Sequence, residues 1–473
     1  MTQPVFHTGD TICAISTPPG SGAIAVIRLS GPEAVAICDK IYTPLQSGAH
    51  PKTKPMPATF KSHTAHLGTI VTAGNILDEV VVTVYRAPHS YTGEDVVEIS
   101  CHGSNYIQQK LIELLVDSGC RQAQPGEFTL RAFLNGRYDL SQAEAVADLI
   151  AAGTQGSHDL ALSQMRGGFS QNIKELRQKL IDFTSLLELE LDFSEEDVQF
   201  ADRKELMALL RTMLKELDRL ISSFSLGNVI KTGIPVAIIG KPNVGKSTLL
   251  NAILNEERAI VSEIPGTTRD YIEDTITAGG LSFRFIDTAG LRHAGDELES
   301  MGVERTLQKI QEAEIILYVC DVSACTAENI GDIIREFREL HSDPSKRRIL
   351  IANKIDKLVE IPPDFRELTD LETIFVSAKR KENISMILDS LTRTVKCDAL
   401  YDTALVSNVR HYEALVRSRD ALTSVEKGFR DGITTDLITI DIKQALYHLG
   451  EITGEITSDE ILGNIFSHFC IGK

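Results

Sequence analysis

The sequence predicts a multidomain protein of mixed α/β and α+β class. It comprises an N-terminal α+β domain, a helical domain made of two separate segments, and an α/β domain inserted between those segments. Three observations lead to this expectation. Short β-branched runs alternate with turns at the start of the chain, a helical period of apolar residues follows and returns near the end, and strands alternate with helices in between. The 473 residues leave room for about three domains. We expect the boundaries at 1–135, 136–225, 226–385 and 386–473, the second and last segments forming one helical domain.

The N-terminal segment mixes strand and helix signals. Residues 23–29 (AIAVIRL) and 80–85 (VVVTVY) are rich in β-branched residues, which is typical of strands. Residues 106–116 (YIQQKLIELLV) have the apolar spacing of a helix. Four prolines and a glycine between residues 44 and 57 predict an exposed loop.

Helical spacing dominates on both sides of the inserted domain, where apolar residues recur at i, i+3, i+4 and i+7. The predicted helical segments are 141–152, 171–192, 206–221, 409–416 and 436–449. The acidic run at 188–197 (ELELDFSEED) is expected to be a solvated helix face and a loop, with a cation site as the alternative.

Charge and cysteine content exclude several classes of protein. The chain has 48 Lys and Arg against 66 Asp and Glu, so its net charge of −18 gives no overall attraction for nucleic acid. An RNA substrate would need a local basic patch or a second protein. The eight cysteines are scattered without a CxxC pair, which argues against a zinc site or a disulfide framework. Neither a membrane span nor a signal peptide pattern is found, so we expect a cytoplasmic protein without membrane association.

Residues 240–247 (GKPNVGKS) match the phosphate-binding pattern G-x-x-x-x-G-K-[ST], directly after the strand-like 235–239 and before a helical segment. The glycines allow backbone N–H groups to surround a β-phosphate. Lys246 supplies a positive charge toward the β and γ oxygens, and the Ser247 hydroxyl can bind Mg²⁺.

Further motifs follow in the order of a guanine-nucleotide-binding domain. Asp287 can reach Mg²⁺ through water, and the Gly290 N–H can meet the γ-phosphate. Thr268 stands where a switch threonine would bind Mg²⁺. Asp356, in NKID after the apolar RILIA, can accept hydrogen bonds from guanine N1–H and the 2-amino group. Ser377-Ala378-Lys379 would complete the base pocket with backbone contacts.

The residues expected to contact GTP are Asn243, Val244, Gly245, Lys246, Ser247, Thr248, Ser262, Glu263, Ile264, Pro265, Gly266, Thr267, Thr268, Asp287, Thr288, Ala289, Gly290, Asn353, Lys354, Ile355, Asp356, Ser377, Ala378 and Lys379.

The residue that orients the attacking water is not settled by these motifs. A Ras-like domain has Gln directly after DTAG, but this chain has Leu291, which cannot orient water. The candidates in the following loop are Asp296, Glu297 and Glu299, with Arg292 and His293 weaker. For any single one of them, a solvated charge in the loop is the reading that the sequence alone favours.

Motifs outside the GTPase core narrow the family. DTICAISTPPGSGAIAVIRLSG, YTGEDVVEISCHG, PGEFTLRAFLNGRYDLSQAEAVADLI and the terminal CIGK together resemble the MnmE (TrmE) family of tRNA-modifying GTPases, over essentially the whole chain. The resemblance implies action with an FAD-containing partner, MnmG, in a heterotetramer or larger complex. That complex installs a (carboxymethyl)aminomethyl group on C5 of the wobble uridine of certain tRNAs. It also implies an N-terminal domain that forms a homodimer and binds 5-formyl- or methylene-tetrahydrofolate as the one-carbon donor.

The resemblance also implies roles for individual residues. Arg28, Glu98, Arg137 and Lys473 match folate-contacting positions, although the position of Arg137 can be Lys in the family. Glu299 matches the water-positioning glutamate. Family members are activated by K⁺ rather than by an arginine finger, and their G domains meet across the nucleotides. The implied K⁺ ligands are Asn243, Ser262, Ile264 and Thr267.

Two questions stay open at this point. Cys470 could add covalently to uridine C6 as a thiolate, or it could serve only for packing and positioning. The whole protein could instead be a regulatory or ribosome-assembly GTPase switch without modification chemistry, or a folate enzyme whose GTPase gates release. The acidic helical segments and the CIGK tail favour the modification enzyme, because assembly factors usually append a basic RNA-binding module.

Overall fold

The computed structural model describes residues 9–45, 56–72, 74–192, 203–256, 260–261, 274–286, 311–324, 327–339, 346–358, 372–393 and 405–473. The chain forms two compact units. Unit 1 comprises Met1–Ala147, Met165–Asp202 and Ser424–Lys473, and unit 2 comprises Asp148–Gln164 and Arg203–Thr423. The helical segments are distributed over both units. The domain boundaries given above stay predictions.

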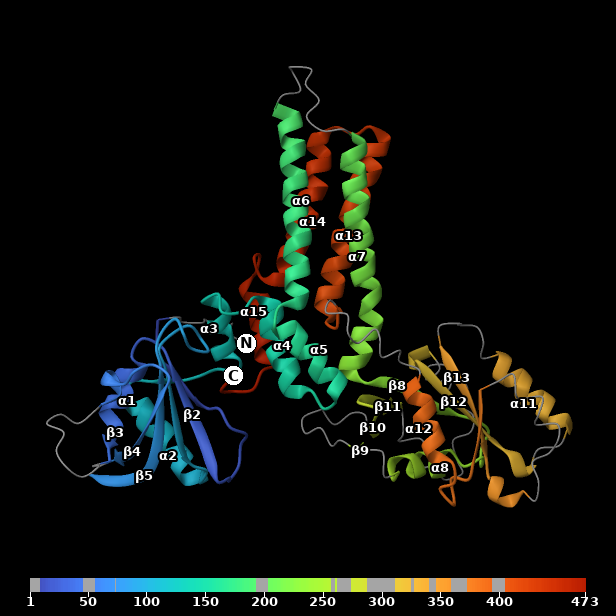
Figure 1. Cartoon of the computed structure of the whole chain (residues 1–473), viewed down its shortest axis with the longest axis horizontal. Helices are drawn as coiled ribbons and strands as arrows, with labels where there is room; N and C mark the ends of the chain where they lie inside the picture. The colour runs from blue at the N-terminus through green and yellow to red at the C-terminus, as the bar shows by residue number, and fades with distance from the viewer. Residues whose placement is uncertain are drawn as a thin grey trace. The chain divides into compact units, whose positions relative to one another are not determined.

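Unit 1 contains a seven-stranded sheet in the order β3-β4-β5-β6-β2-β1-β7, drawn in blue in Figure 1. Its pairs are antiparallel except that β1 runs parallel to β7. The strands are β1 (Ile12–Ile15), β2 (Ile24–Ser30), β3 (Tyr42–Pro44), β4 (Thr64–Thr72), β5 (Asn75–Tyr85), β6 (Val96–His102) and β7 (Arg121–Gln122).

One face of this sheet is covered by α1 (Ala34–Ile41) and α2 (Asn105–Asp117). Every second residue of β5 is buried from Val80 to Val84, which is the alternation of a strand with one covered face. Both predicted strands and the predicted helix of this segment are confirmed. The predicted exposed loop is wrong at its ends, because Pro44 belongs to β3 and Pro57 is buried at the start of a 3₁₀ turn; residues 46–55 lie outside the described residues.

The other helices of unit 1 are α3 (Glu127–Leu134), the first part of α4 (Leu140–Ala151), α6 (Gly168–Asp192), the end of α13 (Val409–Asp431), α14 (Thr435–Thr453) and α15 (Asp459–Ser467). Helices α6 and α14 pack side by side. A small core around Leu130, Leu140 and Phe466 joins α3, α4 and α15. The chain then returns to the start of α3, where Ile471 forms a β-bridge with Pro125.

Unit 2 contains a second seven-stranded sheet, in the order β14-β13-β12-β8-β11-β10-β9. The strands are β8 (Ile234–Ile239), β9 (Ile260–Val261), β10 (Asp274–Ala278), β11 (Leu281–Phe285), β12 (Ile315–Asp321), β13 (Arg347–Asn353) and β14 (Thr373–Val376). Strands β8, β11, β12, β13 and β14 are parallel, which confirms the predicted alternation of strands and helices.

Helices cover both faces of this sheet. Helices α8 (Lys246–Leu254) and α12 (Ile384–Arg393) pack on one face, and α11 (Ala327–Glu339) packs on the other. The central strands β8 and β12 are therefore buried almost along their whole length. Because the strands are parallel, the carboxyl ends of β8, β12, β13 and β14 meet at one edge.

Helices α5 (Gln155–Met165), α7 (Arg203–Thr232) and the first part of α13 complete unit 2. The predicted helical segments fall inside helices, except that residue 152 lies just beyond the end of α4. The acidic run ends α6 at Asp192, and its residues 193–197 lie outside the described part of the chain. No helix within the described ranges is long and apolar enough to cross a membrane.

Candidate functional site

The loop between β8 and α8 has the conformation that its two motif glycines allow. Gly240 has φ 148° and Gly245 has φ 97°, both values that residues with side chains rarely adopt. A Cβ on Gly240 would lie 2.2 Å from the Val319 carbonyl oxygen, and one on Gly245 would lie 2.5 Å from Nδ2 of Asn353. Neither position can carry a side chain without moving β12 or Asn353.

Lys246 begins α8 and turns back over this loop. Its Nζ donates to the carbonyl oxygens of Gly240 and Lys241, both at 2.8 Å. The ammonium therefore lies beside the backbone that surrounds a β-phosphate in sites of this type, at a helix N-terminus that favours negative charge. Ser247 follows on the first turn of α8 and offers a hydroxyl oxygen, a hard donor of the kind that Mg²⁺ prefers.

Asn353 connects three of the predicted nucleotide-binding segments. It is buried at the end of β13, where its Nδ2 donates to the Val244 carbonyl oxygen at 2.9 Å. Its Oδ1 accepts from the Ala378 N–H at 3.0 Å. One amide thus joins the phosphate loop to the loop after β14.

Asp356 is oriented by the same loop. The Ser377 hydroxyl donates to Oδ1 of Asp356 at 2.7 Å, and this hydrogen bond lowers the pKa of the Asp356 carboxyl. Asp356 therefore remains a carboxylate acceptor, which is what reading guanine N1–H and the 2-amino group requires. Ser377 also accepts from the Arg380 N–H, which closes the turn after β14.

Lys354 reaches across to the phosphate loop. Its Nζ donates to the Asn243 carbonyl oxygen at 2.7 Å and to Oδ2 of Asp321 at 2.5 Å. Sequence reasoning missed Asp321, although its place at the carboxyl end of a buried parallel strand was a usable signal.

Among the other predicted nucleotide contacts, Thr248 lies in α8, Ile355 in the 3₁₀ turn after β13 and Lys379 in the turn after β14. The rest lie outside the described residues: the segment from Ser262 to Thr268, which holds most of the predicted metal ligands, the segment from Asp287 to Gly290, and Glu299 with its neighbouring candidates. Within the described part of the chain, no group of three or more His, Cys, Asp or Glu side chains could hold a metal ion.

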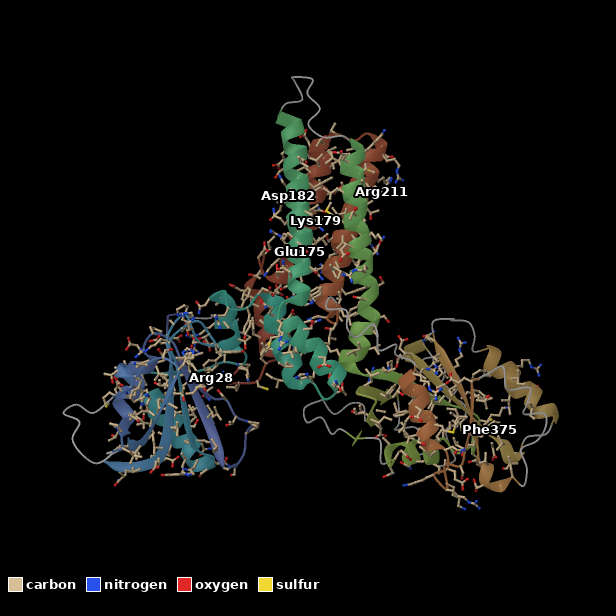
Figure 2. All side chains as sticks on the ribbon, viewed as in Figure 1. Arg28, Glu175, Lys179, Asp182, Arg211 and Phe375 are labelled. Carbon is tan, nitrogen blue, oxygen red and sulfur yellow. The ribbon has the colours of Figure 1, made fainter. Side chains whose placement is uncertain are left out.

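A second candidate site lies on the sheet of unit 1, where Arg28 on β2 stands directly opposite Glu98 on β6. Arg28 Nε and Nη2 lie 2.9 and 2.8 Å from Oε1 of Glu98. The guanidinium also lies over the rings of Tyr91 and Phe128, 5.1 and 5.7 Å from their centroids. Its Nη1 is buried and has no hydrogen-bond partner among the described residues, so it can donate to a bound ligand. Figure 2 labels Arg28 on the sheet.

A cavity of about 370 Å³ opens beside this pair. Its lining residues are His63, Tyr85, His89, Ser90, Tyr91, Arg137 and Tyr138. Tyr85 lines the cavity and hydrogen-bonds Glu98, so it connects the cavity to the ion pair. Burial, the charge of Glu98 and this hydrogen bond raise the pKa of the Tyr85 hydroxyl. Arg137 therefore lines the same cavity as Tyr91, over whose ring the Arg28 guanidinium lies.

The C-terminal tail reaches the same place. Burial and the positive charge of Arg28 lower the pKa of Lys473, against the opposing effect of Glu98. Gly472 has φ 95°, and a Cβ there would lie 2.3 Å from the Ile15 carbonyl oxygen. Cys470 is exposed, and its carbonyl oxygen accepts from the Gly126 N–H at 3.4 Å. All four predicted folate positions therefore gather around one part of unit 1.

Sequence reasoning missed two supports of this site, Tyr91 and Arg131. Arg131 is 2% exposed and hydrogen-bonds Asp10, Glu94 and Glu127. It thereby ties the segment that carries Tyr91 to α3, and the Tyr91 hydroxyl pairs with Thr129 at 2.9 Å. The quoted motifs YTGED and FTLRAF contained both residues, but only their long-range contacts reveal the role.

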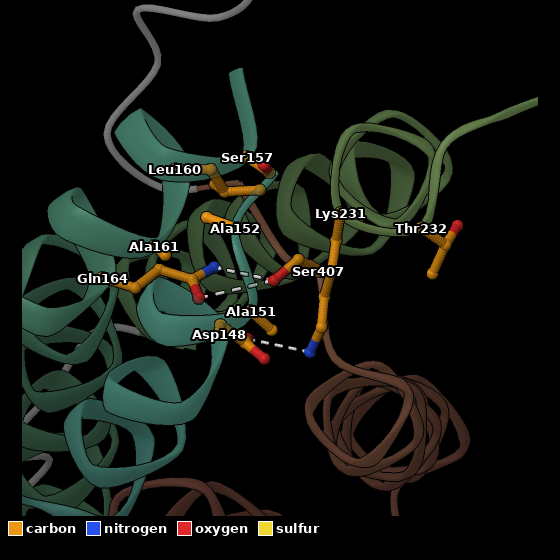
Figure 3. Close-up of a pocket in the computed structure, with 10 residues that line it drawn as sticks. All are labelled: Asp148, Ala151, Ala152, Ser157, Leu160, Ala161, Gln164, Lys231, Thr232 and Ser407. Carbon is orange, nitrogen blue, oxygen red and sulfur yellow. Dashed lines mark hydrogen bonds and ion pairs between the residues drawn. The ribbon is translucent and has the colours of Figure 1, made fainter. Parts of the chain in front are cut away.

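A smaller pocket of about 170 Å³ lies within unit 2 (Figure 3). Lys231 pairs with Asp148 at 2.8 Å, and Gln164 donates to the Leu405 carbonyl oxygen and to Ser407. Its charged groups pair with each other, and no predicted site residue lines it.

Comparison with known proteins covers nearly the whole chain. Residues 11–137 match the model of the "GTP-binding protein TrmE N-terminus", and residues 140–470 match that of the "MnmE helical domain". The tRNA modification GTPase MnmE of Cytophaga hutchinsonii is 52% identical over 100% of both chains. Its counterparts in Flavobacterium johnsoniae and Bacteroides fragilis are each 50% identical, over 98% of this chain and 99% of theirs.

Proposed function

The chain belongs to the MnmE family of tRNA modification GTPases, and from this we propose that it is the GTP-hydrolysing component of a tRNA-modifying complex. That complex adds a (carboxymethyl)aminomethyl group to C5 of the wobble uridine in certain tRNAs. The observation that carries the proposal is the convergence of the phosphate loop, Asn353 and the Asp356–Ser377 pair at the carboxyl edge of one parallel sheet.

Each described residue at this edge has a distinct task in binding GTP. Lys246 neutralises charge on the β and γ oxygens, and Ser247 would hold Mg²⁺ through its hydroxyl. Asp356 selects guanine, because adenine offers no donor pair to its carboxylate. Asn353 keeps the phosphate loop and the base-reading loop at a fixed spacing.

Hydrolysis is assigned to residues that the sequence motifs and the family resemblance single out. Leu291 cannot orient water, so Glu299 would position the attacking water. Asn243, Ser262, Ile264 and Thr267 would hold K⁺, and their oxygen donors suit a hard monovalent cation. The ion supplies positive charge where an arginine finger acts in other GTPases.

The cavity beside Arg28 is proposed to bind 5-formyl- or methylene-tetrahydrofolate, the source of the one-carbon unit. Arg28 Nη1 offers an unpaired donor, Glu98 an acceptor, and Arg137 and Lys473 positive charge toward the glutamate tail. Tyr85 and Tyr91 provide aromatic walls for the flat parts of the ligand. Cys470 lies near this site as a free, exposed thiol, and both of its candidate roles remain consistent with that position.

The proposed partners are a second copy of the chain, the FAD-containing MnmG, and tRNA, all in the cytoplasm. Ile24 and Leu67 support the homodimer, since they are 67% and 52% exposed on the sheet face that carries Arg28. The net charge of −18 supports a second protein that helps to hold the tRNA.

Nucleoside mass spectrometry of tRNA from a deletion strain tests this function. We expect the C5-substituted wobble uridine to disappear and to return with the wild-type gene but not with Lys246→Ala. Lys346→Ala is the matched control, because Lys346 precedes β13 at the opposite edge of the sheet. A nucleoside profile unchanged by deletion would instead favour the regulatory or ribosome-assembly switch.

A further inference from the structure

The ammonium of Lys354 is held between two acceptors from different parts of unit 2. One is the Asn243 carbonyl oxygen in the phosphate loop, at 2.7 Å, and the other is Oδ2 of Asp321 at the end of β12, at 2.5 Å. The side chains of Lys354 and Asp321 are 24% and 18% exposed, so most of the ion pair is shielded from water. A single ammonium thus ties together the ends of β8, β12 and β13.

The sheet register places Asp321 where this contact requires it. Strands β12 and β13 run parallel with Asp321 opposite Asn353, one residue before Lys354. The other carboxylate oxygen of Asp321 accepts from the backbone N–H and the hydroxyl of Ser323, at 3.0 and 2.6 Å. Both oxygens are therefore oriented, one by the turn after β12 and one by Lys354.

The backbone at both ends of the Lys354–Asn243 contact is in an unfavourable conformation. Asn243 has φ 62° and Lys354 has φ 71°, in the left-handed region that residues with side chains seldom occupy. Such conformations persist where surrounding contacts hold them. The bond from Nζ of Lys354 to the Asn243 carbonyl joins the two strained positions directly, and Asp321 keeps that ammonium in place.

We propose that Asp321 is a positioning residue for guanine-nucleotide binding, which fixes the phosphate loop relative to the base-reading loop by holding Lys354 against Asn243. The inference rests on the proposed binding of guanine nucleotides at this site. The ionised state of Asp321 agrees with this role: burial opposes ionisation, but the hydrogen bonds from Lys354 and Ser323 outweigh it and lower the pKa of the carboxyl.

This role differs from that of Asp356 in a measurable way. Asp356 reads the 2-amino group, which GDP has and IDP lacks, so its loss changes the preference between the two nucleotides. Asp321 acts through Lys354 on the spacing of the two loops, and its two carboxylate oxygens are engaged by Ser323 and Lys354. Its loss should weaken both nucleotides by the same factor.

The test uses the full chain with Mg²⁺ and measures displacement of fluorescent N-methylanthraniloyl-GDP by GDP and by IDP. We expect Asp321→Asn to raise the dissociation constants of both about tenfold, as for loss of a shielded charged hydrogen bond, without changing their ratio. Asp321→Glu should recover part of the affinity. Asp332→Asn is the matched control, because Asp332 pairs with Arg335 on the exposed surface of α11.

A double-mutant cycle identifies the path of the effect. In the Lys354→Met background, Asp321→Asn should weaken GDP binding no further, because its partner is already gone. Additive losses would overturn the proposal. So would wild-type affinity in a variant with unchanged circular dichroism, or a changed GDP-to-IDP ratio. If Asp321→Asn does not fold, Asp321→Ser takes its place in the same cycle. Failure of the wild-type chain to bind GDP would overturn the proposed function itself, which separates the two outcomes.

Discussion

The nucleotide-binding edge of unit 2 and the Arg28 site of unit 1 both belong to seven-stranded sheets, but the two sheets present their side chains differently. In unit 2 the strands are mainly parallel, and the functional residues follow the strand ends as short continuous motifs. In unit 1 the pairs are antiparallel, and Arg28 and Glu98 face each other in mid-strand, 70 residues apart. A parallel sheet collects loop backbone at one edge, whereas an antiparallel sheet assembles a site from cross-strand side-chain pairs.

Loss of the phosphate-loop lysine tests whether the two sites act independently. Lys246→Ala should reduce GTP hydrolysis by about 100-fold or more, because the phosphates lose their positive charge. Binding of 5-formyl-tetrahydrofolate to the same variant should stay unchanged, since Lys246 belongs to unit 2 only. Phosphate release and equilibrium folate binding measure the two effects. A parallel loss of folate binding would show that the two regions are coupled.

The second prediction makes the reciprocal test in unit 1. Arg28→Ala should weaken 5-formyl-tetrahydrofolate binding by about 30-fold, as expected when a charged hydrogen-bond donor is lost. Arg28→Lys should recover little, because one ammonium cannot replace the planar guanidinium over Tyr91. Lys110→Ala, on the exposed surface of α2, controls for the change in net charge. GTP affinity that fell together with folate affinity would contradict the comparison.

The difference between the two sheets also explains how much the sequence could predict. Asn353, Asp356 and Ser377 were predicted because their motifs carry their chemistry locally, directly after apolar strands. Asp321 was missed although it occupies an equivalent strand end, because its role depends on the distant Lys354. A local sequence pattern is therefore enough to predict site residues where the ligand contacts consecutive residues of one loop.

In unit 1 the residue pattern alone indicated only an α+β domain. Arg28, Glu98 and Lys473 were expected only through the family resemblance, because single polar residues usually face solvent. The contribution of Tyr91 depends on Arg131, which is buried among Asp10, Glu94 and Glu127. Such a network joins segments more than 100 residues apart, so a local sequence pattern cannot predict it.

Base recognition in unit 2 depends on the carboxylate of Asp356. Asp356→Asn should shift the preference between GTP and xanthosine triphosphate by about tenfold toward the latter, because the amide can donate to the xanthine oxygen. Removal of the Ser377 hydroxyl, which orients Asp356, should have a smaller effect on GTP binding. Ser377→Ala should weaken GTP binding less than Asp356→Asn while keeping guanine preferred. Competition binding measures both, and an unchanged nucleotide preference in Asp356→Asn would remove the carboxylate from base recognition.

The smallest expected effect concerns the tail of unit 1. The pKa of Lys473 lies below that of an ordinary lysine, because burial and the charge of Arg28 disfavour the ammonium. As the pH rises, Lys473 therefore loses its charge earlier than an exposed lysine, and attraction for the anionic glutamate tail falls with it. As the pH is raised toward the range in which an ordinary lysine loses its proton, wild-type affinity for 5-formyl-tetrahydrofolate should drop about threefold, a modest effect since solvent screens a half-buried charge. Lys473→Arg stays charged over this range and should show a flat profile, whereas an identical drop in Lys473→Arg would assign the pH dependence to another group.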